Sequence, residues 1–571
     1  MLRAYRTACC ALALVALATF GCGTGEAGPD AVAPQADVPQ VADGATDASD
    51  AEAPPSTYRN PILPADYSDP DAVRVGDDYW MISSSFNHVP GLPVLHSRDL
   101  VSWTLEGHAL PRLVPEDYFS VPRHGKGVWA PSLRVEDGLY RLYYPDPEAG
   151  LYLITATDPR GAWSPPVQVV PGPGRIDPCP FRDDDGTPYL VHAWAKSYAG
   201  INNRLTLLRL APDGRSVAED LGVLIDGDAF PGTTTLEGPK VYRRNGWVYV
   251  LAPAGGVTDG WQLAFRARSV TGSYEARTVL ARGATDVNGP HQGALVDTPS
   301  GEWWFLHFQD KGVYGRVVHL EPVAWVDDWP VIGDDPDADG TGQPVAEHAR
   351  PDLPAQPPAA PATSDAFDGP ALGPQWQWQA NPQPDWASLE ARPGFLRLAA
   401  VPEPAPGRLY DAPNLLLQKL PAEAFTVTAA LDGAGLAEGE RAGLVVFGFA
   451  YSWLGLARVD GALQVVRAVD KSAVAGTAET ARPLATLPEG VTVAEVRVSV
   501  VAGGSCRFDY RLDGTFVPAP APGAAAGSDP PFQATAGRWV GAKVGVFAAA
   551  PCAGGVGHVD VDEVRVDVPP P

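Results

Sequence analysis

The sequence predicts an all-β protein made of a five-bladed β-propeller followed by a β-sandwich, on three observations. Alternating apolar patterns broken by turn residues are frequent, long helical patterns are scarce, and Gly and Pro number 60 each among 571 residues. One unit of strand, tight turn and aromatic strand recurs five times before residue 310. An alternating pattern resumes at Ser364, after a Pro- and Ala-rich stretch. A chain of this length needs two or more cores.

The repeated unit is a strand, a turn rich in Asp, Asn and Gly, and an aromatic-rich strand. Its turn glycines recur at intervals of about 50–60 residues, near the period of propeller blades. Each blade buries little surface alone, so neighbours supply its core, and the first strand of each blade lines a central channel. The five copies lie at residues 73–82, 133–143, 181–190, 241–250 and 295–305.

A proline stands in similar register just upstream of each copy, where its missing N–H costs no ladder hydrogen bond. Asp69 and Asp177 directly precede their prolines, and Glu237 stands two residues before its own. Trp129 occupies this place in the second copy, and His291 follows the proline of the fifth. Because equivalent positions of the five blades meet at one mouth of the channel, we expect these five side chains to converge there.

Three carboxylates beside an aromatic platform, without a Ser or Cys nucleophile motif, favour acid/base hydrolysis of a neutral polar substrate. Hydrolysis of a glycoside needs one acid to protonate the leaving oxygen and one carboxylate to activate water. A third carboxylate raises the proton affinity of the acid. One such acid alone would be better explained as a turn cap, but three in one register favour a site. Asp71 competes with Asp69 for the base, since a strand would point both the same way.

Seven segments together resemble glycoside hydrolase family 43, the five-bladed hydrolases of plant hemicelluloses. The resemblance covers residues 58–333 and implies that Asp69 is the general base, Glu237 the general acid and Asp177 the residue that tunes the pKa of the acid. It also implies inversion of anomeric configuration. The segments are Tyr58–Leu63, Ser68–Asp71, His96–Trp103, Val128–Ser132, Ile176–Pro178, Glu237–Lys240 and Val323–Gly333.

The same resemblance implies further substrate-binding residues around the Trp129 platform. Phe86 and His88 are expected to line the sugar pocket, and Arg316 to lie near the sugar hydroxyls. His291 resembles a family histidine at the channel centre that is associated with calcium through waters, and a core histidine without metal is the alternative. No cofactor is expected to be required, and a structural calcium ion at His291 is kept as an option.

Two further motifs are interpreted as structural. Trp103 is expected in the core of its blade. The segment Asp335–Gly340 imitates a calcium loop, but Ala346 stands where an EF-hand has its glutamate. We therefore interpret it as the exit from a propeller over 58–335, with a loose calcium site as the alternative.

Residues 336–363 are predicted to be a linker and residues 364–571 a β-sandwich. Asp365–Gly369 and Gln375–Gln379 resemble the concanavalin-like domain that follows the propeller in family-43 xylosidases. This domain could support the propeller, bind glycans or cover one edge of the pocket, and the sequence leaves the three roles open. Its expected strands include 394–398, 425–429, 442–447, 463–467, 494–500 and 558–566.

Residues 1–22 have a basic start and a short apolar run, which predicts an export signal. The end of this segment resembles a lipoprotein cleavage box with Cys22 as the lipidated residue, and a secreted protein without an anchor is the alternative. Residues 23–57 contain no Lys or Arg and predict a disordered acidic Ala/Pro tether. We thus expect a cell-surface or periplasmic lipoprotein, in which Cys506 and Cys552 could pair and Cys179 is a buried small residue.

The net charge of −26 disfavours nucleic acid and anionic membranes as partners, so we expect membrane contact only through a lipid anchor. The sequence leaves the oligomeric state open. It predicts an exo-acting, inverting hydrolase that releases a terminal pentose, either β-1,4-linked xylose or α-L-arabinofuranose, from xylan- or arabinan-derived oligosaccharides. An endo-acting arabinanase would need an open groove across the propeller, but the extra loop at 114–127 together with the sandwich domain argues for a closed pocket. A non-catalytic carbohydrate-binding propeller would have no need of an acid/base pair.

Overall fold

The computed structural model describes residues 55–525, 527–551, 555 and 557–569. The described residues from Pro55 onward belong to one compact unit. The predicted export signal with Cys22, the tether up to residue 54 and Cys552 lie outside the described residues. Among the residues that are described, no helix has the length and apolar character needed to cross a membrane.

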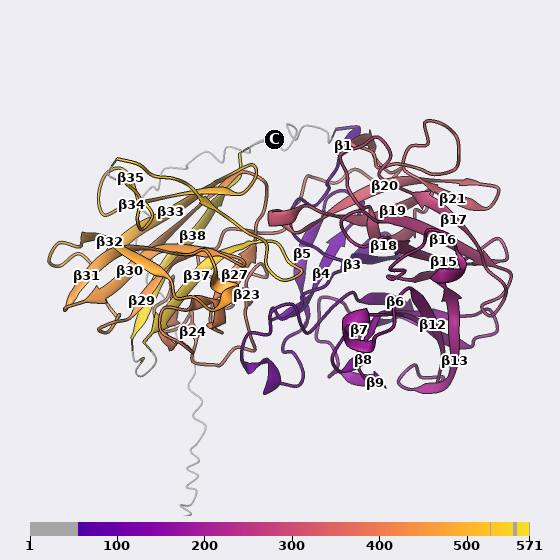
Figure 1. The fold of residues 1–571 in the computed structure, drawn as a ribbon, viewed down its shortest axis with the longest axis horizontal. Helices are drawn as coiled ribbons and strands as arrows, with labels where there is room; N and C mark the ends of the chain where they lie inside the picture. Colours follow the sequence, from indigo (N-terminus) through magenta and orange to yellow (C-terminus); the bar gives the residue numbers. More distant parts are fainter. Residues whose placement is uncertain (1–54, 526, 552–554, 556, 570–571) are drawn as a thin grey trace, which may run out of the picture. The chain divides into compact units, whose positions relative to one another are not determined.

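Strands β2 to β21 form five antiparallel sheets of four strands, each in sequence order, and these are the five blades of a propeller (Figure 1). The predicted fold class is therefore confirmed. The blades are β2–β5 (Asp71–Val75, Asp78–Ile82, Gly91–Ser97, Thr104–Leu110), β6–β9 (Ser132–Glu136, Leu139–Asp146, Gly150–Ala156, Val167–Pro171), β10–β13 (Arg175–Arg182, Pro188–Trp194, Arg204–Leu210, Val217–Asp226), β14–β17 (Lys240–Arg244, Trp247–Ala254, Trp261–Ala267, Glu275–Leu280) and β18–β21 (His291–Asp297, Trp303–Asp310, Arg316–Val326, Trp329–Ile332).

The five sequence repeats are the hairpins formed by the first two strands of each blade. Their turn glycines all adopt φ between 64° and 91°, a left-handed conformation that glycine reaches without a Cβ clash. These glycines are Gly76, Gly138, Gly186, Gly246 and Gly301. The turn requirement therefore explains why the repeat is visible in the sequence.

The ring closes without a covalent link between its first and last blades. β1 (Thr57–Arg59) pairs with β22 (Glu347–Ala349), which brings the start of the propeller to the segment that leaves it. Arg74 of the first blade forms an ion pair of 2.8 Å with Asp297 of the fifth. Both ties join residues more than 200 positions apart and hold the ends of the ring together.

The sandwich consists of two eight-stranded sheets whose apolar faces share one core. One sheet holds β23 (Gln377–Trp378), β26 (Val401–Pro402), β27 (Leu416–Lys419), β29 (Arg441–Phe447), β30 (Tyr451–Val459), β31 (Ala462–Asp470), β32 (Thr480–Thr486) and β37 (Lys543–Ala550). The other holds β24 (Ala387–Ser388), β25 (Leu396–Ala399), β28 (Phe425–Asp432), β33 (Val493–Val501), β34 (Ser505–Arg511), β35 (Val517–Pro518), β36 (Phe532–Gln533) and β38 (His558–Asp567).

Direct contacts join the sandwich to the propeller. Val89 and Trp378 exchange two backbone hydrogen bonds, and Tyr314 of the propeller belongs to the core of the sandwich. The short helices are α1 (Lys196–Ala199), η1 (Tyr118–Ser120), η2 (Gly227–Ala229), η3 (Gly312–Tyr314), η4 (Leu409–Asp411) and η5 (Ala473–Ala475).

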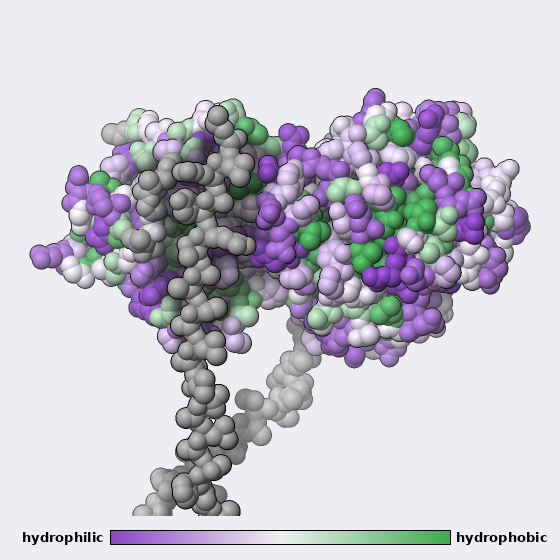
Figure 2. All heavy atoms as spheres, turned by 90° about the horizontal axis from the view of Figure 1, so that it is seen from below, coloured by the Kyte–Doolittle hydropathy of each residue, from purple (hydrophilic) through white to green (hydrophobic). Residues whose placement is uncertain are grey.

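Large aromatic side chains fill the blades, and Trp103 is fully buried, as predicted. Cys179 is also fully buried, against the backbone N–H of Val241 at 3.3 Å. On the face seen in Figure 2, hydrophilic residues are interspersed with smaller apolar patches.

Candidate active site

Four of the five expected side chains meet in one cavity of about 250 Å³ in the propeller. These are Asp69, Trp129, Asp177 and Glu237. Phe86 and Arg316, both expected to bind substrate, also line it. The sequence did not single out its other lining residues, which are Ala130, Ile176, Thr235, Gly256, Val257, Gln292 and Trp539.

The local backbone explains why the two aspartates occupy equivalent places. Asp69 lies two residues before β2, and Asp177 lies in β10 where the register shifts between Ile176 and Cys179. Their φ angles are 55° and 54°, a left-handed conformation that Asp tolerates better than most residues. Strained backbone of this kind is often found at functional sites.

Asp69 is held by hydrogen-bond donors on both carboxylate oxygens. Arg316 Nη1 lies 3.3 Å from each oxygen, and the Ser84 hydroxyl donates a bond of 2.5 Å to Oδ2. Asp69 and Arg316 are both buried. A charged donor and a hydroxyl thus fix the orientation of this carboxylate.

The other two acids hold their protons more tightly than ordinary carboxyls. Burial, with the nearby charges of Asp177 and Asp69, raises the pKa of Glu237 to about 8. Burial also raises the pKa of Asp177 to about 7, against the hydrogen bond of 2.8 Å that the Gly238 N–H donates to it. Glu237 is therefore suited to donate a proton near neutral pH.

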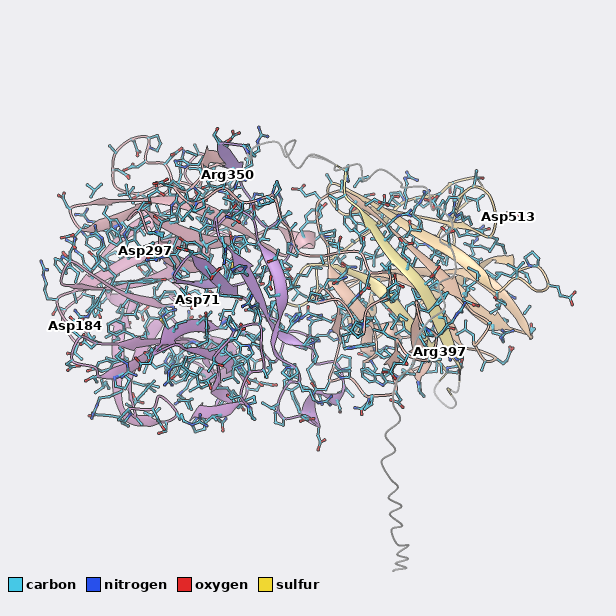
Figure 3. All side chains as sticks on the ribbon, turned by 180° about the vertical axis from the view of Figure 1, so that it is seen from behind. Asp71, Asp184, Asp297, Arg350, Arg397 and Asp513 are labelled. Atoms are coloured by element: carbon cyan, nitrogen blue, oxygen red, sulfur yellow. The ribbon has the colours of Figure 1, made fainter. Side chains whose placement is uncertain are left out.

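Asp71, the competitor for the base, lies outside the cavity. It is fully buried, forms an ion pair of 2.9 Å with Arg134 and accepts the Leu133 N–H at 2.8 Å. Lys240 Nζ lies 3.6 Å away. In Figure 3 Asp71 lies inside the propeller, whereas Asp184 lies at its edge. The structure thus separates the two candidates, because Asp71 ties three blades together while Asp69 faces the cavity.

Two expected binding residues do not line the cavity. His88 is buried with Nδ1 3.2 Å from the Ser85 carbonyl, and it lines a separate cavity with His124 and Lys543. Its loop turns toward the sandwich, because the next residue pairs with Trp378, and the sequence carries no signal for that docking. The expectation that His88 contacts the sugar in this cavity is therefore corrected.

His291 lies behind Glu237 rather than at the cavity wall. It is fully buried, and its Nε2 is 3.4 Å from Glu237 Oε1. Within the described part of the chain, neither ring nitrogen has a hydrogen-bond partner. Calcium takes oxygen ligands, so an ion near His291 would have to be held through waters, which two unpartnered nitrogens allow.

Trp539, from the sandwich domain, lines the cavity. Its ring centroid lies 5.8 Å from that of Trp129, and the Arg316 guanidinium lies 5.9 Å from the Trp539 centroid. Trp539 is 43% exposed although it is a large apolar residue. The sequence left three roles open for the sandwich. These direct contacts support one of them, the covering of one edge of the pocket. The only sequence signal was an isolated Trp in a Gly-rich segment.

A larger cavity of about 660 Å³ contains none of these acids. Its walls are mostly apolar and include Tyr67, Leu105 and Lys419. We locate the site by its group of three carboxylates and not by volume, because acid/base chemistry needs paired acids and the larger cavity is lined, among the described residues, by a single carboxylate, Glu423.

Two protein-family profiles match the chain. Residues 58–330 match the profile of glycosyl hydrolases family 43, and residues 364–567 match that of the beta xylosidase C-terminal concanavalin A-like domain. A putative beta-xylosidase of Xylanibacter ruminicola is 41% identical over 64% of this chain and 66% of that protein. The chain thus spans about two thirds of that relative.

A non-reducing end alpha-L-arabinofuranosidase of Bacteroides ovatus is 30% identical over 68% of this chain and 73% of that protein. The crystal structure of a xylan beta-1,4-xylosidase from Bacillus halodurans superposes with a TM-score of 0.77 at 25% identity, over 89% of this chain and all of that one. The family profile together with these relatives shows that the chain belongs to glycosyl hydrolase family 43.

Proposed function

We propose that the protein is an exo-acting, inverting glycosidase that releases a terminal pentose from hemicellulose oligosaccharides. The observation that carries the proposal is the cavity in which Asp69, Asp177 and Glu237 lie with two tryptophans. Its volume of about 250 Å³ is below the range of about 300–1,000 Å³ typical of drug-sized ligands. Such a space suits one sugar unit, and Trp539 covers one edge of it, which favours attack at a chain end over an open groove.

The proposed reaction is a single displacement at the anomeric carbon. Glu237 gives its proton to the glycosidic oxygen as the bond from that oxygen to the anomeric carbon breaks. Asp69 takes a proton from the water whose oxygen bonds to the opposite face of that carbon. Burial, with the charges of Asp177 and Asp69, keeps Glu237 protonated, and Arg316 orients Asp69. Inversion requires a separation of about 6.5–9.5 Å between base and acid.

The terminal sugar is either β-linked xylose or α-L-arabinofuranose. The names of two relatives support one each, beta-xylosidase and alpha-L-arabinofuranosidase. The carboxylates do not distinguish them, since the ring atoms of the two linked sugars nearly superpose. We place xylose first, because the relative with the higher identity and the sandwich profile both carry that name.

The test compares kcat/KM for p-nitrophenyl β-xyloside and p-nitrophenyl α-L-arabinofuranoside, and follows the first-released anomer by proton NMR. We expect a clear preference for one glycoside and an inverted anomer. Digestion of linear xylooligosaccharides or arabinooligosaccharides should release only monosaccharide at early times. Retention of the anomeric configuration would reject inversion, and oligosaccharides among the early products would reject exo action. Binding without turnover would reject the hydrolytic function.

We also propose that the protein is exported and anchored through lipid on Cys22. Support comes from the basic start, the apolar run and the Lys- and Arg-free segment that follows. Metabolic labelling with palmitate should mark the natural chain and not Cys22→Ala. Equal labelling of the two would exclude Cys22 as the lipid site.

A further inference from the structure

Three buried metal-ligating side chains lie side by side in the fifth blade, apart from the acid-lined cavity. His307 of β19 stands directly opposite His319 of β20, and their rings stack with centroids 5.2 Å apart. Glu321 lies two residues further along β20, on the same face of the strand. All three are at most 2% exposed. One nitrogen of each ring and one carboxylate oxygen lie within 4.8 Å of one another.

The hydrogen bonds of His307 leave two acceptors facing each other. Its Nδ1 lies 3.2 Å from the carbonyl oxygen of Phe308, which can only accept, so Nδ1 carries the proton. Nε2 of the neutral ring is then a lone pair, and it lies 3.1 Å from Glu321 Oε1. Two lone pairs at this distance need a cation between them, which is either a proton or a metal ion.

His319 contributes another lone pair. The side-chain amide of Gln309 donates to Asn288 Oδ1 at 2.9 Å and to the Asp286 carbonyl, so its oxygen is the atom that faces His319 Nε2 at 3.2 Å. Nε2 therefore donates, and Nδ1 keeps a lone pair. That Nδ1 is buried and has no partner among the described residues. Buried polar atoms are nearly always paired, so this one requires an explanation.

We propose that His307, His319 and Glu321 form a site for a zinc ion that fastens the ring of blades. Zinc binds imidazole nitrogen and carboxylate oxygen at about 2.0–2.2 Å, which places neighbouring ligand atoms of a tetrahedron about 3.4 Å apart. The His307 to Glu321 distance of 3.1 Å is close to that edge. Two imidazoles disfavour calcium and magnesium, which take oxygen ligands. A water would complete the tetrahedron.

Glu321 connects this site to the closure of the propeller. Its Oε2 accepts the Val345 N–H at 2.8 Å, and Asn60 Nδ2 lies 3.4 Å from Oε1. Asn60 also bonds both backbone groups of Leu320. Asn60 belongs to the segment that enters the propeller and Val345 to the segment that leaves it. An ion on Glu321 would therefore link two strands of the fifth blade to the ends of the ring. The role is structural and does not depend on the proposed catalytic function.

The test uses the full chain, refolded with and without zinc sulfate and then dialysed. We expect one zinc ion per chain by elemental analysis, and a rise of several degrees in melting temperature that is absent without zinc. Cobalt(II) in place of zinc should give the intense visible absorption of a tetrahedral ion. His319→Gln and Glu321→Gln should lose both the ion and the spectrum, whereas His96→Gln, in a half-buried ion pair with Asp78, should retain them.

Three outcomes would overturn the proposal, and the first needs no variant. Natural-sequence protein that keeps neither zinc nor cobalt after dialysis would show that a shared proton holds His307 and Glu321 together. Undiminished zinc in His319→Gln, checked for folding by circular dichroism, would place the ion elsewhere. Asp337→Asn tests the group of Asp335, Asp337 and Asp339, in which the last two are exposed. Loss of zinc in that variant alone would also overturn the assignment.

Discussion

The backbone N–H of Gly541, in the sandwich, donates a hydrogen bond of 3.0 Å to Oδ2 of Asp66, in the propeller. The other oxygen of Asp66 accepts the backbone N–H of Arg316 at 2.9 Å. Gly541 lies two residues after Trp539, so one buried carboxylate holds the loop that covers the cavity against the arginine that holds Asp69. A Cβ on Gly315 would lie 2.4 Å from Asp66 Cγ, so this junction is closely packed.

We therefore expect Asp66→Asn to impair the site without removing any group that lines it. The amide nitrogen would face a backbone N–H donor in place of an acceptor, and a lost buried hydrogen bond of this kind costs about 1–3 kcal/mol. Misplacement of Trp539 should raise KM and that of Arg316 should lower kcat, with kcat/KM falling about tenfold or more. The exposed Asp77→Asn is the matched control. Kinetics equal to those of the control would show that Asp66 does not position the site.

Glu237→Gln should lower kcat by about 10²–10⁴-fold on substrates whose leaving group needs a proton. A nitrophenyl leaving group with a low pKa needs little protonation, so its glycoside should lose much less activity. Asp69→Asn should lose activity with both leaving groups, because the attacking water needs its base in each case. Steady-state kinetics with a series of leaving groups measure the contrast, and the exposed Glu275→Gln serves as control. An equal loss across the series for Glu237→Gln would remove it from the acid role.

The pH dependence of kcat/KM should change when the charge of Asp177 is removed. In the proposed reaction the acid is protonated Glu237, so kcat/KM should fall as pH rises through its raised pKa of about 8. Asp177→Asn removes one negative charge that raises this pKa, so the alkaline limb should move to lower pH. Asp213→Asn, on an exposed turn, should leave the limb in place. A limb that stays fixed or moves upward in Asp177→Asn would contradict the tuning role.

The sequence predicted what depends on local chemistry and on repetition. The turn glycines and the prolines before the first strands are local requirements, so they revealed the five blades and brought Asp69, Asp177 and Glu237 to one register. It could not decide between Asp69 and Asp71, because a regular strand points both the same way. The left-handed backbone at Asp69 and the charges of Arg134 and Lys240 around Asp71 made the difference.

The errors and omissions concern contacts between distant segments. His88 lies in a loop that the sandwich draws away from the cavity, and Trp539 comes from a segment 470 positions after Asp69. No periodicity encodes such docking, which depends on the complementary surfaces of two folded domains. The sandwich strands at 425–429 and 494–500 were predicted well, since alternation of apolar residues is a local pattern.

Stability should rise with pH between about 7 and 10.5 because of Lys543, a buried residue of the sandwich. Burial lowers its pKa to about 7, with a further lowering by the charge of Lys419 opposite it and a weaker raising by Asp66. In this window the unfolded chain binds a proton that the folded chain does not, so the free energy of unfolding increases by up to about 1.4 kcal/mol per pH unit. Lys543→Met removes the group and should flatten that slope, whereas the exposed Lys471→Met should not. Urea unfolding at a series of pH values measures the slopes, and a slope unchanged in Lys543→Met would mean that this amine stays charged in the folded protein.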